Sequence, residues 1–379
     1  MMATNKGSGF ATLTITLVLV SMLVAVSVFI GKVLIADKRI TLNEIEYRVA
    51  LAAAEKGIAE AMALLKADPA ASSASGTLTT SAATASYVVT MTQGVPISSA
   101  WQLESVATLP NGGGTTVSVQ VVDRGILNPA NAGPAAPLVV GGTSTGISGN
   151  MTVVANPNGG GPGVPVSVWS GDNISGGGSM QTCHLEDYNG SDCANTLSTK
   201  SGGTVIFDSD VVDNDPDFPS DLLGHVFGYG ADEWDKLEAM ATAIVSSCSD
   251  IGSSGFYIVD GAGECDIDQI VSSVQNPVIA LVKDANIKAN GGNQFYGLLF
   301  SYDSDPASAP DYTLKLNGNA KIFGAISTNH GGDNLNGTFD AVYDQQVICN
   351  LGHCNGHTGG SAVSPFVRLM IVPGSWKDW

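Results

Sequence analysis

The sequence predicts an α+β fold, in which a long N-terminal helix packs on an antiparallel sheet and a β-rich C-terminal head follows. Three observations predict this fold. Residues 10–66 contain no proline and repeat their apolar residues at helical spacings. Residues 85–123 hold three runs of strand-forming residues, and the chain beyond residue 137 is rich in Gly, Asn and Asp. We expect the head to be either solenoid-like or sandwich-like.

The composition excludes some classes of protein. The chain has 379 residues, enough for two or three domains, with 16 basic and 35 acidic residues and a formal charge of −19. Nucleic acid is not expected as a partner, because binding to its phosphates needs clustered Lys and Arg. Only 13% of the residues are charged and 46 are glycine. This mixture indicates an exported β protein rather than a helical cytosolic enzyme.

The first apolar run is long enough to cross a membrane. Residues 7–31 carry no charge, and a helix of about 20 apolar residues spans a bilayer. We therefore expect residues 10–31 to be transmembrane, with Lys6 holding the N-terminus in the cytoplasm. A secretory signal peptide has a shorter apolar core of roughly 7–15 residues and then a cleavage site. An ordinary signal anchor is the alternative.

The helix is predicted to continue beyond the apolar run. Apolar side chains recur at helical spacings, for example at Ile45, Ile58 and Leu65, and charged residues occupy the other faces. The Asp-Pro pair at 68–69 ends the pattern. A helix over residues 10–66 would be about 85 Å long, and its amphipathic second half suits packing on a globular domain.

A small antiparallel sheet is expected over residues 67–127. Strand-forming runs occupy residues 85–92, 101–109 and 115–123, and the last of them alternates valine with polar residues. The sequence "PNGGG" at 110–114 is a hairpin turn signal. These features together predict a meander that packs against the helix.

The distal part of the chain is expected to form a separate head. Residues 128–137 are predicted to be a linker, and residues 138–379 the head, with one helix at 231–248. Two similar segments, "QFYGLLF" (294–300) and "KIFGAIS" (321–327), lie 27 residues apart, and each follows a Gly/Asn turn. Such a repeat is typical of stacked strands, but two copies do not separate a solenoid from a sandwich.

The cysteines indicate disulfides in an oxidising compartment. All six lie in the distal half and form locally spaced pairs, and short loops close most readily. The expected pairs are Cys183–Cys193, Cys248–Cys265 and Cys349–Cys354. The alternative for the last pair is a zinc site in which Cys349 and Cys354 join His353 and His357. A nine-residue loop makes a cramped metal cage, so we expect the disulfide and no metal.

An acidic run at residues 208–221 is a candidate cation site. It is not an EF-hand loop, because Phe218 stands at the position of the required glycine and Gly224 at that of the final glutamate. The alternatives are calcium in another geometry, or a solvated loop in which Asp221 caps a helix. The acidic residues of the run are Asp208, Asp210, Asp213, Asp215, Asp217 and Asp221.

No catalytic motif is present, and we do not expect an enzyme. A membrane-anchored carbohydrate-active β-helix enzyme would need a pair of carboxylates, and nothing in the sequence singles out such a pair. Glycans could bind to exposed aromatic side chains, although a tryptophan in a strand or helix is more often part of the core. The candidate tryptophans are Trp169, Trp234, Trp376 and Trp379.

The N-terminal features together resemble a type IV pilin, and most of all a PilX-type minor pilin. They are the basic leader "MMATNKGSG", the Gly-Phe junction, the apolar half-helix and the segment "ALAAAEKGIAEAMALL", which is similar to the "AAEAGL"-type end of the PilX N-terminal module. The resemblance implies that a prepilin peptidase removes residues 1–9. Lys6, Gly9 and Phe10 would mark the site, Phe10 would be methylated, and Gly7 is the alternative cut.

The resemblance also implies a place in the cell. The protein would wait in the inner membrane with its N-terminus cytoplasmic and its head periplasmic. It would then enter a pilus at the cell surface, with other minor and major pilins as partners.

One residue of the major pilin pattern is missing. Major pilins carry a glutamate at the fifth mature position, where this chain has Thr14, or Thr12 if the cut follows Gly7. In the family that glutamate is thought to pair with the amine of the subunit ahead, so its absence predicts a tip subunit, like the tip pseudopilin of type II secretion. Docking inside the filament by apolar packing alone is the alternative.

These observations predict a minor pilin that primes assembly and sits at or near the tip of a type IV pilus. The second interpretation is a tip-borne adhesin or a calcium- or glycan-binding head. The third is the anchored carbohydrate-active enzyme. No cofactor is expected apart from the alternative of calcium.

Overall fold

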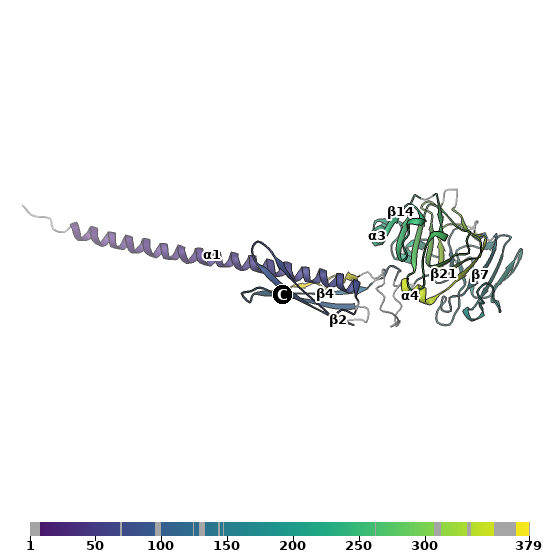
Figure 1. Cartoon of the computed structure of the whole chain (residues 1–379). Helices are drawn as coiled ribbons and strands as arrows, with labels where there is room; N and C mark the ends of the chain where they lie inside the picture. Colours follow the sequence, from purple (N-terminus) through teal and green to yellow (C-terminus); the bar gives the residue numbers. More distant parts are fainter. Residues whose placement is uncertain are drawn as a thin grey trace, which may run out of the picture. The chain divides into compact units, whose positions relative to one another are not determined.

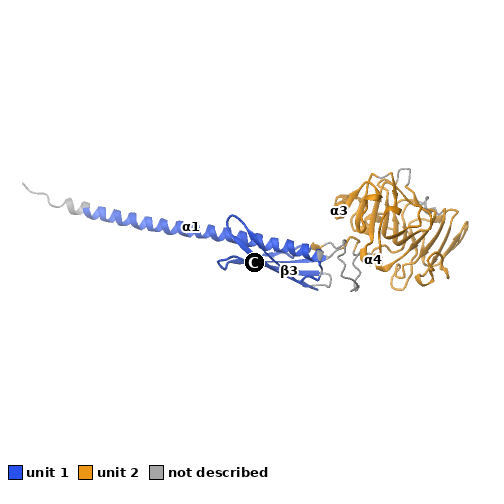
Figure 2. Cartoon of the chain, in the orientation of Figure 1, with its two compact units in different colours: residues 1–122, 371–379 blue, residues 123–370 orange. Residues whose placement is uncertain are grey.

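The computed structural model describes residues 8–68, 70–94, 100–123, 125–128, 133–142, 145–146, 148–261, 263–306, 312–331, 335–351 and 369–378. The chain forms two compact units, which Figure 2 colours separately. The first unit combines residues 1–122 with residues 371–379, and the second consists of residues 123–370. The second unit is therefore an insertion within the first, and two chain connections join them.

The first unit is a long helix on an antiparallel sheet, as the sequence predicts (Figure 1). Helix α1 (Ser8–Ala67) is continuous, and its second half packs on the sheet. Consecutive strands pair antiparallel. Their bounds are β1 (Ser73–Thr79), β2 (Thr84–Gln93), β3 (Ala100–Thr108) and β4 (Gly114–Asp123).

Strand β1 is absent from the sequence prediction. Its sequence "SASGTLT" is small and polar, and it forms the edge of the sheet, where no residue is fully buried. A strand of this kind lacks the apolar alternation that marks a half-buried strand. The three predicted strands are confirmed to within one residue at each end.

The last residues of the chain return to the first unit. Strands β24 (Leu369–Ile371) and β25 (Lys377–Asp378) both lie along β4, and β25 runs antiparallel to it. Between them, the backbone N–H of Val372 donates to the carbonyl of Gln120 over 2.9 Å. Residues 371–379 were expected in the head, and this expectation is wrong. Strand pairing over such a sequence distance leaves no local signal.

The second unit is a parallel β-solenoid, which decides between the two predicted alternatives. Its main sheet contains the order β10-β7-β23-β21-β19-β17-β15-β14, in which every neighbouring pair is parallel. A second parallel sheet has the order β16-β18-β20-β22. The chain alternates between the two sheets along residues 255–342, so each coil places one strand in each sheet.

The elements of this unit are mostly short strands. The strands of the main sheet are β5 (Leu138–Val140), β7 (Asn150–Val154), β8 (Val168–Ser170), β10 (Ser179–Cys183), β11 (Thr199–Ser201), β12 (Thr204–Ile206), β13 (Val211–Val212), β14 (Ala243–Val245), β15 (Gly255–Val259), β17 (Val278–Lys283), β19 (Gln294–Tyr302), β21 (Ala320–Thr328) and β23 (Thr338–Val342). The other strands and the α-helices of the unit are β6 (Thr145–Gly146), β9 (Ile174–Ser175), β16 (Glu264–Asp266), β18 (Asn286–Ala289), β20 (Leu314–Leu316), β22 (Leu335–Asn336), α2 (Leu222–Phe227), α3 (Trp234–Met240) and α4 (Gln345–Leu351).

The 27-residue repeat corresponds to two adjacent coils. Strands β19 and β21 pair in a register that places Phe295 beside Ile322 and Gly297 beside Gly324. Gly297 and Gly324 have φ angles of 148° and 132°. A Cβ on Gly324 would overlap the carbonyl oxygen of Gly297. Glycine is therefore required at position 324, because the backbones of β19 and β21 approach too closely there for a side chain.

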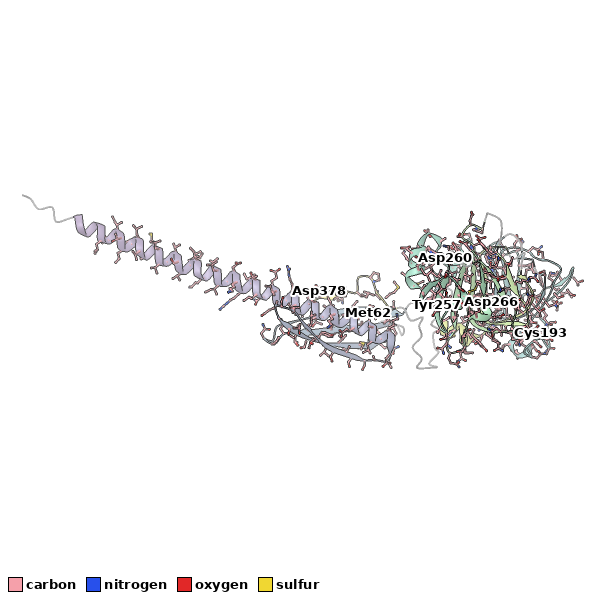
Figure 3. All side chains as sticks on the ribbon, turned by 45° about the horizontal axis from the view of Figure 1, so that its top comes forward. Met62, Cys193, Tyr257, Asp260, Asp266 and Asp378 are labelled. Carbon is pink, nitrogen blue, oxygen red and sulfur yellow. A yellow bond between two sulfur atoms is a disulfide. The ribbon has the colours of Figure 1, made fainter. Side chains whose placement is uncertain are left out.

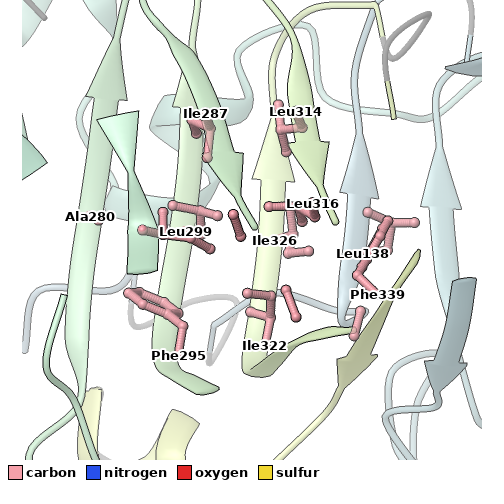
Figure 4. Close-up of a cluster of buried hydrophobic side chains, with 14 of the residues drawn as sticks. Leu138, Ala280, Ile287, Phe295, Leu299, Leu314, Leu316, Ile322, Ile326 and Phe339 are labelled. Carbon is pink, nitrogen blue, oxygen red and sulfur yellow. The ribbon is translucent and has the colours of Figure 1, made fainter. Parts of the chain in front are cut away.

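The core of the solenoid lies between its two sheets (Figure 4). Ile287 of β18 and Leu316 of β20 face Leu299 of β19 and Ile326 of β21, and all four are fully buried. Strand β7 continues this stack beyond β23, although it precedes β23 by almost 190 residues in the sequence. The N-terminal part of the unit therefore extends the coils formed by its C-terminal part.

Two predicted boundaries differ from the structure. Described residues of the expected linker at 128–137 belong to the solenoid unit, where Ala136 is buried and the carbonyl of Ala135 accepts a hydrogen bond from the Asn156 side chain over 2.8 Å. The helix expected at 231–248 ends with α3 at Met240. The apolar residues that follow, Ala243–Val245, form β14 instead, because they can pair with the edge of β15 at the end of the main sheet.

Candidate functional site

The apolar half of α1, residues 8–31, is the first candidate site. In this half, apolar side chains are exposed in every direction around the helix axis. Residues 17–20, for example, are all exposed, and consecutive residues of a helix point in directions about 100° apart. Figure 3 shows these side chains projecting from the helix with no other described part of the unit packed on them. This helix is long and apolar enough to cross a membrane. The surface suits lipid or other apolar helices.

The few polar side chains in this half are hydroxyls. Thr16 Oγ1 donates to the carbonyl of Leu13 over 2.9 Å, and Ser21 Oγ donates to that of Val18 over 2.8 Å. Bonds within the helix satisfy these hydroxyls without a partner from outside. Thr14 is exposed in the same stretch, and the first acidic residue is Asp37. The first basic residue of α1 is Lys32, so residues 8–31 contain no side chain that would be charged inside a membrane.

The second half of α1 is fixed to the sheet by small residues. Ala50, Ala53 and Ala61 are fully buried. A Cβ on Gly57 would lie 2.5 Å from Ser105 Oγ and 2.9 Å from the Tyr87 ring. The helix and the sheet therefore approach to a distance that only small side chains allow.

Polar contacts flank this packed face. The Tyr87 hydroxyl donates to the carboxylate of Glu60, and Lys56 Nζ donates to the carbonyl of Thr77 over 3.0 Å. Burial, with a further contribution from Glu60, raises the pKa of Tyr87 to about 12. The phenol therefore remains a neutral hydrogen-bond donor at physiological pH, and the contact persists there.

The second candidate site is a groove of about 660 Å³ on the solenoid. A row of polar side chains crosses its floor, because the strand registers place Lys321, Asp340, Thr152, Gln181 and Thr199 side by side on five neighbouring strands. Gln181 Nε2 donates to Thr152 Oγ1 over 3.0 Å. Amides, hydroxyls and carboxylates in a shallow groove suit a ligand rich in hydroxyl groups.

Charged groups in the groove are partly desolvated. Asp340 accepts a hydrogen bond of 2.6 Å from the Tyr188 hydroxyl, and Lys321 Nζ lies 3.9 Å from Asp340 Oδ2. Burial raises the pKa of Asp340, against the opposing effects of Tyr188 and Lys321. Burial also raises the pKa of Tyr188. Asp192, on the same groove, contributes to both shifts through its charge.

The predicted processing residues lie at the edge of the described chain. Lys6 and Gly7 fall outside the described residues, while Gly9 and Phe10 belong to α1 by their backbone. The cut after Gly9 therefore remains a prediction.

Two disulfides join the cysteines that were paired on spacing. They are Cys183–Cys193, of which Cys193 is labelled in Figure 3, and Cys248–Cys265. Cys349 is also disulfide-bonded. Cys354, His353 and His357 lie outside the described residues, so the third pair remains a prediction.

The acidic run at 208–221 has structural roles. Asp210 is buried and accepts hydrogen bonds from the hydroxyls of Ser167, Thr182 and Ser198, so its carboxylate serves as a buried acceptor within the solenoid. Asp221 caps α2 by accepting from the N–H of Gly224 over 2.9 Å, which confirms that expectation. Among the described residues, no group of three or more His, Cys, Asp or Glu side chains is arranged to hold a metal ion.

The tryptophans differ in their surroundings. Trp169 packs on Phe218 at 4.8 Å and donates to Asp215, and Trp234 stacks on Tyr302 at 5.3 Å. Trp376 is 40% exposed, and Trp379 lies outside the described residues. Trp169 and Trp234 are therefore engaged in packing rather than presented as a flat glycan platform.

The polar row of the groove was not predicted from the sequence. Its members come from segments as distant as residues 152 and 340, which only the strand order brings together. A local signal does exist in three of these strands, where one polar residue stands between apolar residues, as in "AKI", "MTVV" and "FDAV". Without the register, that signal does not show that the polar residues align.

The comparisons with known proteins are sparse. No protein-family model matches the chain, and no curated protein matches it. Among solved structures, the competence-associated pilin ComZ from Thermus thermophilus aligns with a TM-score of 0.28 and 12% sequence identity, over 87% of this chain and 97% of that one.

Proposed function

We propose that the protein is a minor pilin that primes the assembly of a type IV pilus and sits at or near its tip. The observation that carries this proposal is the first unit: a charge-free apolar half-helix, exposed all round, continues without a break into a half that packs on an antiparallel sheet. Such a helix can be stored in a bilayer and can then exchange lipid for the apolar helices of other pilins.

Two features favour the tip over the shaft. The position expected to be fifth in the mature chain is Thr14, which has no carboxylate for the amine of a subunit ahead. The inserted solenoid comprises residues 123–370, about twice the length of the first unit. Heads of this size would collide between neighbours in a tightly packed helical filament, whereas the end of the filament leaves room for one.

Antibody labelling of intact pili tests this placement. We expect gold-labelled antibody against the solenoid to mark filament ends, at very few copies per pilus. Deletion of the protein should reduce the number of pili more than their length, because a primer acts at initiation. Regular labelling along the shaft, at a stoichiometry near that of the major pilin, would contradict the proposal.

Introducing the missing carboxylate is expected to bring no benefit. Thr14→Glu places an acidic side chain in the membrane segment, at a cost of about 3 kcal/mol if it stays charged and unpaired. We expect unchanged or reduced pilus number, counted by electron microscopy, with Thr14→Gln as the uncharged control of equal size. An increase in the protein's copies along the shaft, seen with Glu and not with Gln, would support an internal position.

Processing is expected to depend on Gly9. Gly9→Val should block cleavage, because a β-branched side chain does not fit a site that accepts glycine, and unprocessed chain should accumulate in the membrane fraction. Gly7→Val is the matched control and should leave the cut in place. If Gly7→Val blocks cleavage and Gly9→Val does not, the site lies at Gly7.

A second candidate function, a tip-borne adhesin that binds glycans, is favoured by the polar groove. The groove is lined by the amide of Gln181 and by the carboxylates of Asp192 and Asp340. Glycan-array binding by the full chain, lost in Gln181→Ala and retained in an exposed control such as Asn195→Ala, would support this function. Turnover of a bound polysaccharide would favour the anchored enzyme instead.

A further inference from the structure

A cavity of about 610 Å³ opens at one edge of the solenoid, at the carboxyl ends of four neighbouring parallel strands. The strand order is β8-β5-β21-β19, and the residues that follow these strands line the cavity: Gly171, Gly142, Asn329 and Asp303. The segment around α2 covers it from the other side. The cavity is separate from the polar groove and shares no residue with it.

Four carboxylates line this cavity, with no Lys or Arg among its described lining residues. Asp303 is only 4% exposed. Its Oδ1 accepts from the N–H of Asp305 over 2.8 Å, whereas its Oδ2 is buried and has no hydrogen-bond partner among the residues that the structure describes. A buried carboxylate oxygen without a partner is costly, so its presence in a lined cavity points to a ligand that supplies the donor.

Two further carboxylates face each other nearby. A Cβ on Gly230 would touch both Asp221 Oδ2 and Asp232 Oδ1, so these oxygens lie close to the same point. Asp221 uses its other oxygen to cap α2. No cation among the described residues of the cavity separates the two charges, and a bound cation would relieve their repulsion.

The walls of the cavity are aromatic and apolar. Phe218, Leu222 and Tyr302 line it, and Tyr302 is held in place by stacking on Trp234 at 5.3 Å. Burial, and then the charges of Asp221, Asp284 and Asp303, raises the pKa of the Tyr302 phenol. An aromatic ring among carboxylates favours a cation that also carries apolar groups.

The carboxylates of the cavity do not converge on one point. Among the described residues no three acidic side chains converge as metal ligands, so a compact divalent cation is not the matching ligand. We propose that this cavity binds an extended cation, in which two or more ammonium groups are joined by aliphatic chain, as in an oligoamine or in neighbouring lysine side chains of a peptide. One ammonium group would bond to Asp303 and another would lie between Asp221 and Asp232.

Titration calorimetry on the full chain in detergent micelles tests this inference, at 0.15 M salt to screen non-specific attraction to the acidic surface. Spermine, tetralysine and calcium chloride are the three probes. We expect an amine to bind, and Asp303→Asn to weaken it at least tenfold. Asp250→Asn removes the same charge from an exposed position outside the cavity and should leave the affinity unchanged. Tighter binding of spermine or of tetralysine identifies a free amine or a peptide as the source.

The unliganded variants provide a second readout. Asp303→Asn removes the charge of a buried carboxylate whose Oδ2 has no hydrogen-bond partner among the described residues, and it keeps an Oδ1 acceptor for the N–H of Asp305. The melting temperature of this variant without ligand should therefore equal or exceed that of the wild type. A markedly lower melting temperature would assign Asp303 a structural role and overturn the inference. It is also overturned if calcium binds more tightly than both amines, or if no probe binds. None of these outcomes bears on the pilus labelling, so the proposed pilin function is tested independently.

Discussion

Replacing Asp210 with alanine is expected to lower the free energy of unfolding of the solenoid by about 4 kcal/mol or more. The carboxylate accepts from Ser167 Oγ and Thr182 Oγ1 over 2.6 Å each, and from Ser198 Oγ over 2.5 Å. All four residues are buried. Removing the carboxylate leaves three hydroxyls without their acceptor, and each buried unsatisfied group costs about 1–3 kcal/mol.

Hydrogen exchange of residues 150–212 measures this effect within the solenoid. Asp208→Ala is the matched control, because Asp208 lies in the same acidic run but is exposed, and its carboxylate accepts from the N–H of Ser209 rather than from buried hydroxyls. We expect rapid exchange in Asp210→Ala and unchanged protection in Asp208→Ala. Equal effects of the two substitutions would show that general charge, rather than the buried hydrogen bonds, is responsible.

Replacing Gly57 with leucine is expected to detach α1 from its sheet, with a loss of about 3 kcal/mol or more in the stability of the first unit. The side chain would enter space already filled by Ser105, Tyr87 and Val89. The helix lacks a hinge at this point, so the whole packed face would have to move outward. The helix itself should persist, because leucine has a higher helix propensity than glycine.

Gly31→Leu is the control for this prediction. It makes the same substitution in the same helix, where a Cβ would meet no atom within 4 Å. Both variants gain the same helix propensity, so the difference in protection of β2 to β4 by hydrogen exchange isolates the packing effect. Protection that is equal in the two variants would contradict the close approach of helix and sheet.

The first unit could largely be predicted from the sequence because its signals are local. Helix α1 has an unbroken pattern over 60 residues, and β2 to β4 alternate apolar and polar side chains. The exceptions were the edge strand β1, which buries too little to need such a pattern, and β25, whose partner Ser118 lies more than 250 residues away. The insertion of the solenoid between β4 and β24 was missed for the same reason.

The solenoid was predictable only in its repeating part. The segments of β19 and β21 align by sequence because their coils have equal shape, down to the glycines at 297 and 324. By contrast, Asp210 belongs to a run that resembles a calcium loop, and its role as a buried acceptor depends on hydroxyls from three other segments. The polar groove and the acidic cavity likewise depend on strand order, which has no local signature.

The mature N-terminus tests the central claim, that the chain is a processed minor pilin, most directly. Intact-mass spectrometry of the protein from membranes and from sheared pili should detect a chain that begins at methylated Phe10 in both fractions. A chain that retains residues 1–9 in the membrane and is absent from pili, or one cut near Pro69 after the helix, would contradict the proposed function.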